Sequence, residues 1–280
     1  MGALVVAAAA AALLFGLFIG WFVLQGWRPT SARRRSSSTV PDPWRSLIHD
    51  RVPLTRSLTE SEWARLLDLA RAFVREKHFE GVDGLVVTEA MQVIVAALAC
   101  LLILHLDIGQ CYPRVRSIIL YPGTFVPRLP ILTRHDPIPE PEPTLGQSLR
   151  GVVVLSWERV AHDAAHTGES GNVVLHEFAH QLDQEDGYVD GVPLLEAPSS
   201  TRVWARVLRE RFEELQRAAA AGTSDVLSAY GATNKAEFFA VATEAFFERP
   251  VEMRSRYPDL YEELKGFFRQ DPAERPPATP

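Results

Sequence analysis

The run Val173–Asp183 (VVLHEFAHQLD) constrains this chain more than any other segment, because it holds three polar side chains in an otherwise apolar stretch. On an α-helix, His176 and His180 lie one turn apart on the same face, where both imidazoles can bind one metal ion. Glu177 lies beside them, where its carboxylate can reach a water molecule. Gly171–Asn172 offers a start for the helix. The H-E-x-x-H pattern therefore predicts a zinc-binding helix, and the alternative is a core helix with hydrogen-bonded, metal-free histidines.

A third metal ligand is expected outside this helix, because a catalytic zinc ion usually has three protein ligands and one open position. The best candidate lies in Ser228–Glu248, whose apolar residues recur at helical spacing. Glu237 and Glu244 are seven residues apart, which is two helical turns, and so point the same way. One suits a metal ligand and the other a partner that orients a histidine. We interpret Glu248, beside Arg249, as a solvated acidic residue.

Two segments, H-E-F-A-H-Q-L-D and A-Y-G-A-T-N-K-A-E-F-F-A-V-A-T-E-A-F-F, carry a resemblance to a known family. They resemble the Mlc titration factor A family of bacterial zinc peptidases and, more distantly, the catalytic domain of anthrax lethal factor. Further matches extend the resemblance from about Trp44 to Pro272. The resemblance implies that the zinc ligands are His176, His180 and Glu237.

The resemblance also implies roles for neighbouring residues. Glu177 would be the general base, and Tyr230, seven residues before the third ligand, would face the reacting centre. Glu244 matches a residue that contacts a metal ligand but not the metal itself, and we predict the same kind of position for Asp183. The expected reaction is hydrolysis of a peptide bond by a zinc-activated water, with Tyr230 as a hydrogen-bond donor to the oxyanion. The family further implies aminopeptidase-like cleavage of short peptides.

A second function of another class follows from the same resemblance. The best-known member of the family binds the glucose-responsive repressor Mlc and removes it from DNA. By resemblance, this chain would sequester a transcriptional repressor, and peptidase activity would be secondary. A third interpretation, a zincin that has lost its activity, is disfavoured because a complete set of site residues is present: His176, Glu177, His180, Tyr230 and Glu237.

Residues 1–27 predict a single transmembrane helix that uses the lipid bilayer as a partner. Ala3–Leu24 is almost wholly apolar, and at about 1.5 Å per residue it is long enough to cross a hydrocarbon core of about 30 Å. A cleaved signal peptide is the rival interpretation, but the segment has neither a basic start nor an A-x-A site after it. The basic residues that follow are Arg28, Arg33, Arg34, Arg35 and Arg45. The positive-inside rule then predicts a body facing the cytoplasm from the inner membrane of a bacterium.

The remainder of the chain divides into a linker, one domain and a short tail. We predict a basic, Ser- and Pro-containing linker over residues 28–45, a peptidase domain over 46–272 and a flexible tail over 273–280. The net charge of −6, despite the basic linker, argues against direct binding of nucleic acid. The two cysteines, Cys100 and Cys111, do not suggest a disulfide framework, which agrees with a reducing compartment.

The expected fold class is α+β, a zincin-like metallopeptidase domain in which helices accompany a small mixed sheet. Leu58–Trp63 contains a capping box that starts a helix running to about Lys77. Gln92–Leu106 predicts a buried core helix, with a second membrane segment as the alternative. Thr201–Ala221 predicts a charged amphipathic helix.

Two short segments rich in β-branched residues, Ser117–Tyr121 and Val152–Trp157, predict strands. Zincins commonly bind substrate along an edge strand upstream of the metal helix, and Val152–Trp157 is the candidate. Asp136–Pro143, with its alternating prolines, predicts an extended surface loop. His162 and His166 are also four residues apart, but their segment lacks an apolar helical face. We therefore predict a loop bordering the cleft there rather than a second metal site.

Overall fold

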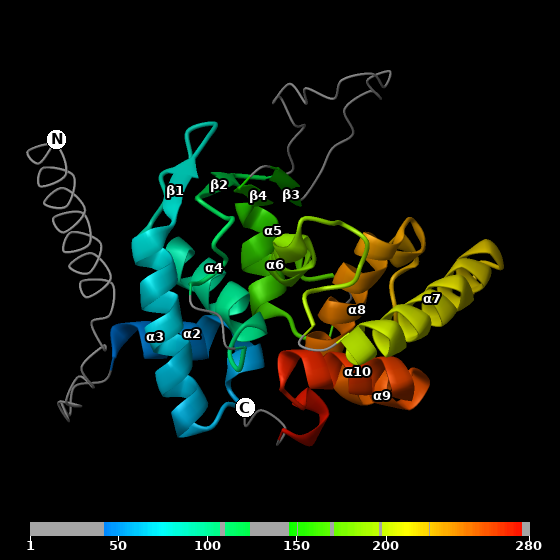
Figure 1. Ribbon diagram of the computed structural model, residues 1–280. Helices are drawn as coiled ribbons and strands as arrows, with labels where there is room; N and C mark the ends of the chain where they lie inside the picture. The colour runs from blue at the N-terminus through cyan, green and yellow to red at the C-terminus, as the bar shows by residue number, and fades with distance from the viewer. Residues whose placement is uncertain are drawn as a thin grey trace, which may run out of the picture. The chain divides into compact units, whose positions relative to one another are not determined.

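In a computed structural model of the chain, the H-E-x-x-H pattern lies on helix α6 (Val173–Asp183). This helix lies between a small sheet and the helices of the C-terminal half (Figure 1). The structure describes residues 42–106, 110–123, 146–149, 151–168, 171–195, 198–223 and 225–275. None of the helices in these ranges has the length and hydropathy that a membrane span requires. The predicted transmembrane segment over residues 1–27 and the predicted loop Asp136–Pro143 lie outside the described residues.

Three helices precede most of the sheet: α2 (Pro43–Arg51), α3 (Glu60–Glu76) and α4 (Glu89–Leu102), with a short 3-10 turn, η1 (Pro53–Thr55), after α2. The predicted capping box starts α3, because Thr59 Oγ1 accepts the Glu62 N–H at 3.3 Å and the Glu62 carboxylate accepts the Thr59 N–H at 2.8 Å. Helix α4 is buried along almost its whole length, so the prediction of a core helix is confirmed. Both cysteines are buried free thiols.

The sheet has four strands in the order β1-β2-β4-β3, namely β1 (His78–Gly81), β2 (Ser117–Tyr121), β4 (Val152–Ser156) and β3 (Gly146–Leu149). Strands β1, β2 and β4 are parallel, and β3 is antiparallel to β4. A mixed sheet among many helices confirms the α+β class. The prediction that Val152–Trp157 is an edge strand is wrong, because β4 is paired on both sides and Trp157 already belongs to the next helix. The edge strands are β1 and β3.

The segment that contains His162 is helical, so the predicted loop there is wrong. Helix α5 (Trp157–Ala165) begins at the N-cap Ser156 and buries Val160 and Ala164, which are one turn apart. Asp163 of the same helix is also buried, and it accepts hydrogen bonds from Arg159 Nε and the Val173 N–H. The imidazoles of His162 and His166 stack with their centroids 4.4 Å apart.

The C-terminal half consists of helices, one of which is deeply buried. These are α7 (Pro198–Ala220), α8 (Lys235–Glu248), α9 (Pro250–Arg256) and α10 (Pro258–Phe268), with the 3-10 turns η2 (Gln184–Asp186), η3 (Ala229–Ala232) and η4 (Pro272–Glu274). Every residue of α8 from Phe238 to Glu248 is buried. Phe246 holds α8 against α10, because its ring lies 5.6 Å from that of Phe268 and 5.0 Å from that of Tyr261. Acidic residues of α8 are consequently held inside the protein.

Candidate metal centre

Helix α6 is fixed in rotation by its apolar side, and this decides where the histidines point. Asn172 caps the helix through Oδ1, which accepts the Leu175 N–H at 3.2 Å, as Gly171–Asn172 predicted. Phe178 is fully buried, and its ring lies 4.7 Å from that of Tyr112. With this side of α6 in the core, the imidazoles of His176 and His180 project towards α8.

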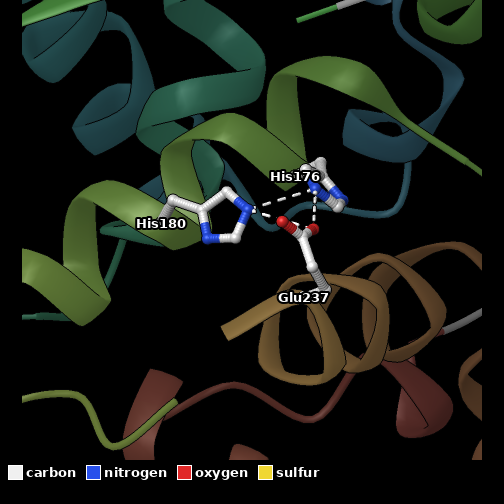
Figure 2. Close-up of side chains that lie close together, drawn as sticks. All are labelled: His176, His180 and Glu237. Atoms are coloured by element: carbon white, nitrogen blue, oxygen red, sulfur yellow. Dashed lines mark hydrogen bonds and ion pairs between the residues drawn. The ribbon is translucent and has the colours of Figure 1, made fainter. Parts of the chain in front are cut away.

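The structure brings the three predicted ligands together (Figure 2). The Nε2 atoms of His176 and His180 are 3.2 Å apart, and Glu237 Oε2 lies 2.9 Å from the first and 3.3 Å from the second. Four ligands in a tetrahedron with bonds of about 2.0–2.1 Å are about 3.3 Å from one another. The triangle formed by the two nitrogens and the oxygen therefore has the size of one face of such a tetrahedron, and the donor set fits a metal ion.

The charges around this triangle are strongly coupled. Burial opposes the charged form of His176, but its hydrogen bonds to Glu237 and Glu244 outweigh this effect and raise its pKa to about 10. Burial also opposes the charged form of Glu237, but the two histidines lower its pKa to about 2. Glu244 Oε1 lies 2.5 Å from His176 Nδ1, on the side of the ring away from Glu237. An acceptor at Nδ1 leaves Nε2 available as a metal ligand.

Glu177 and Tyr230 both line the cleft beside the three ligands. Glu177 is only 5% exposed, and burial raises the pKa of its carboxyl to about 7. Tyr230 is 57% exposed, and its ring centroid lies 5.9 Å from that of His176. Partial burial of the phenol, together with the nearby carboxylates of Glu237 and Glu177, raises the pKa of Tyr230. The cleft thus contains a carboxyl that titrates near neutral pH and a phenol that stays protonated there.

Asp183 is fully buried at the end of α6, one turn after His180. Neither of its carboxylate oxygens has a hydrogen-bond partner among the described residues. Burial raises the pKa of Asp183 to about 6, and the nearby Gly191 N–H and His180 act in the opposite direction. No hydrogen bond joins Asp183 to His180 among the described residues, so the support of this ligand by Asp183 stays a prediction.

Glu248 is buried, so its interpretation as a solvated residue is wrong. Its Oε1 accepts the Asn172 Nδ2–H at 2.9 Å and its Oε2 accepts the Gly168 N–H at 3.0 Å. Burial raises the pKa of Glu248 to about 7. The charge of Arg249, its neighbour in sequence, suggested an exposed position, but α8 is covered along this whole stretch.

The cleft has a volume of about 880 Å³ and is bounded by α6, α7, the start of α8 and the loop after α6. Sequence reasoning missed the residues that line it outside the metal centre, namely Gln184, Val189, Asp190, Phe212, Gln216, Thr233, Asn234, Lys235 and Ala236. His162 and His166 are not among the described residues that line it.

Gly191 fixes the loop that forms one wall of this cleft. Its φ is +78°, and a Cβ there would lie 2.5 Å from the carbonyl oxygen of Lys235. Trp204 Nε1 also donates to the Gly191 carbonyl at 3.0 Å. The loop is therefore held against the beginning of α8, close to Glu237.

Comparisons with known proteins agree with this geometry. A family model described as glucose-regulated metallo-peptidase M90 matches residues 24–269. The protein slr2042 of Synechocystis sp. is 31% identical over 264 residues, which are 93% of this chain and 95% of that protein. The Mlc titration factor A proteins of Yersinia pestis and Yersinia pseudotuberculosis are each 30% identical over 236 residues, which are 80% of this chain and 83% of theirs. The chain belongs to the glucose-regulated metallo-peptidase M90 family.

Proposed function

We propose that this protein is a zinc-dependent peptidase with a zincin-like domain, in which Glu177 is the general base. One observation carries the proposal: the ligand atoms of His176, His180 and Glu237 lie within 4.8 Å of one another in the wall of a cleft, with the Glu177 carboxyl in the same wall. Membership of a metallo-peptidase family supports a metal ion at this position. Two imidazoles and one carboxylate are a donor set that suits zinc.

The residues of the cleft suggest how hydrolysis would proceed. A zinc ion held by His176, His180 and Glu237 would polarise the peptide carbonyl and lower the pKa of a water molecule. Glu177 would take a proton from the attacking water and pass it to the leaving amine, and a pKa of about 7 suits both transfers. Tyr230 would donate a hydrogen bond to the carbonyl oxygen as negative charge develops.

Two further acids would hold the ligands in place. Glu244 accepts from His176 Nδ1 and so orients the ring. We propose the same task for Asp183 towards His180, because Asp183 is buried at the end of α6, one turn after His180, and is close enough for the two charges to interact.

Short peptides cleaved in the manner of an aminopeptidase are the substrates that we propose. The family resemblance supports this choice, and the cleft of about 880 Å³ falls in the range of about 300–1,000 Å³ that is typical of small-ligand sites. The name of the Yersinia relatives, Mlc titration factor A, supports a second function. In this alternative, the chain binds a transcriptional repressor, and hydrolysis is secondary.

Removal of the metal tests the peptidase proposal. We expect full-length protein treated with a chelator to lose its hydrolysis of a panel of aminoacyl and peptide p-nitroanilides, and to regain it when about one zinc ion per chain is restored. Zinc content and kcat are measured on the same samples. Turnover that survives complete removal of the metal would contradict the proposal.

We further propose that residues 1–27 anchor the protein in the inner membrane of a bacterium, with residues 46–272 in the cytoplasm. The support is the charge-free apolar run and the arginines that follow it. The test is fractionation of cells that express the full chain or a chain lacking residues 2–27. The full chain should sediment with membranes and need detergent for its release, whereas the shortened chain should not. Equal distributions of the two would overturn the anchor.

A further inference from the structure

The first turn of α6 is surrounded by three buried carboxylates from two other helices. Asp163 of α5 accepts the Val173 N–H at 3.0 Å, and Glu244 of α8 accepts the Asn172 N–H at 2.8 Å. Glu248, one turn beyond Glu244 on α8, accepts the side-chain amide of Asn172 at 2.9 Å. Backbone N–H groups at the start of a helix have no partner within the helix and favour negative charge. The three acids therefore satisfy groups that would otherwise be buried without partners.

Contacts of Asn172 connect Glu248 to the metal centre. The Asn172 carbonyl accepts the His176 N–H at 2.9 Å, while Asn172 Oδ1 caps the helix at Leu175. The side chain of Asn172 thus has its Oδ1 in the cap and its Nδ2 on Glu248. Because an amide has this fixed pair of groups, the bond to Glu248 also sets the orientation in which Asn172 caps α6.

Glu237, Glu244 and Glu248 form a ladder along the side of α8 that faces α6. Their spacing of seven and four residues keeps all three on one helical face. They contact His176 Nε2, His176 Nδ1 and Asn172, in that order. The three glutamates therefore connect α8 to α6 at three successive positions along α8, and the contact of Glu248 is the last of them. Burial raises the pKa of Glu248 to about 7, because an ionised carboxylate at this buried position costs free energy.

We propose that Glu248 is a positioning residue of the metal centre. Its hydrogen bond to Asn172 holds the first turn of α6 at the distance from α8 at which His176 meets both Glu237 and Glu244. The inference rests on the proposed metal site, but it concerns a residue that touches neither a ligand nor the cleft. Loss of the bond would leave the ligands present and misplace one of them, which weakens metal binding.

The test compares Glu248→Ala with Glu248→Gln in the full-length protein. The glutamine side chain has a similar size, and its one carbonyl oxygen can keep the bond to Asn172 while the bond to the Gly168 N–H is given up, whereas alanine loses both bonds. We expect Glu248→Ala to bind zinc about 10–100-fold more weakly in competition with a chelator, the loss typical of partners that support a ligand. Glu248→Gln should bind within about threefold of the wild type. The visible absorption of bound Co²⁺ should change only in Glu248→Ala.

A control variant separates positioning from a general loss of stability. Ile48→Ala removes a fully buried side chain from α2, a helix that contributes no residue to the ligand cluster or the cleft, and so destabilises the core. At equal folded fraction, it should retain wild-type zinc affinity. Unchanged affinity in Glu248→Ala, an equal loss in Glu248→Gln, or an equal loss in Ile48→Ala would each overturn the inference. Failure of the wild type itself to bind zinc would instead refute the proposed function.

Discussion

Glu177→Gln is expected to reduce peptide hydrolysis by about 10²–10⁴-fold, the usual contribution of a general base, while zinc remains bound. A glutamine side chain fits the space of the 5% exposed carboxyl, but its amide cannot accept the proton of the attacking water. Glu177 is not one of the three clustered ligand residues, so the metal should stay. The measurement is kcat and zinc content of the full-length variant, with the exposed Glu252→Gln on α9 as the matched control.

The same variant separates the two candidate functions. If the protein acts by binding a transcriptional repressor, Glu177→Gln should bind that repressor as tightly as the wild type does, although its hydrolysis is lost. A fully active Glu177→Gln variant would show that another group accepts the proton. The proposed mechanism would then be wrong even if the metal site were correct.

The second large effect is expected at the ligand on α8. Glu237→Ala should weaken zinc binding by more than about 100-fold, because even residues that only support a ligand contribute about 10–100-fold. The substitution removes the oxygen that lies 2.9 Å from His176 Nε2 and 3.3 Å from His180 Nε2. Two imidazoles then remain, which is one ligand fewer than a catalytic zinc ion usually has.

Competition with a chelator and the zinc content after dialysis measure this loss. Glu252→Ala serves as the control, since it removes an exposed acid of the C-terminal half without touching the cleft. A Glu237→Ala variant that kept wild-type affinity and one zinc ion per chain would show that the third ligand lies elsewhere. Activity alone would not decide this, because a misplaced substrate also lowers kcat.

Helices α3, α4 and α6 were predictable from the sequence because their signals are local. The capping box at Thr59 and Glu62, the apolar run of α4 and the N-cap of α6 each lie within a few residues of the element that they start or fill. Strands β1 and β3, of four residues each, were missed because so short a run has little periodicity of its own. The pairing of β1 with β2 joins segments that are distant in sequence, whereas β3 pairs with β4, which follows it closely in the chain.

Errors at the candidate site have the same origin. Val152–Trp157 shows the composition of a strand, but only the pairing of β4 on both sides excludes it as an edge. Glu248 has the sequence context of a surface acid, and only the packing of α8 among its neighbours makes it buried. The lining residues Val189 and Phe212 carry no chemical signal, because they line the cleft through the path of a loop and the placement of α7.

The sequence by itself determined the chemical groups of the metal centre and their spacing within each helix. One helical turn places His176 beside His180, and two turns place Glu237 in line with Glu244, whatever surrounds them. Only the tertiary structure decided that these two helices meet, since His176 and Glu237 are 61 residues apart. The physical reason is that helix geometry acts over a few residues, whereas burial, charge coupling and the shape of a cleft depend on packing between distant segments.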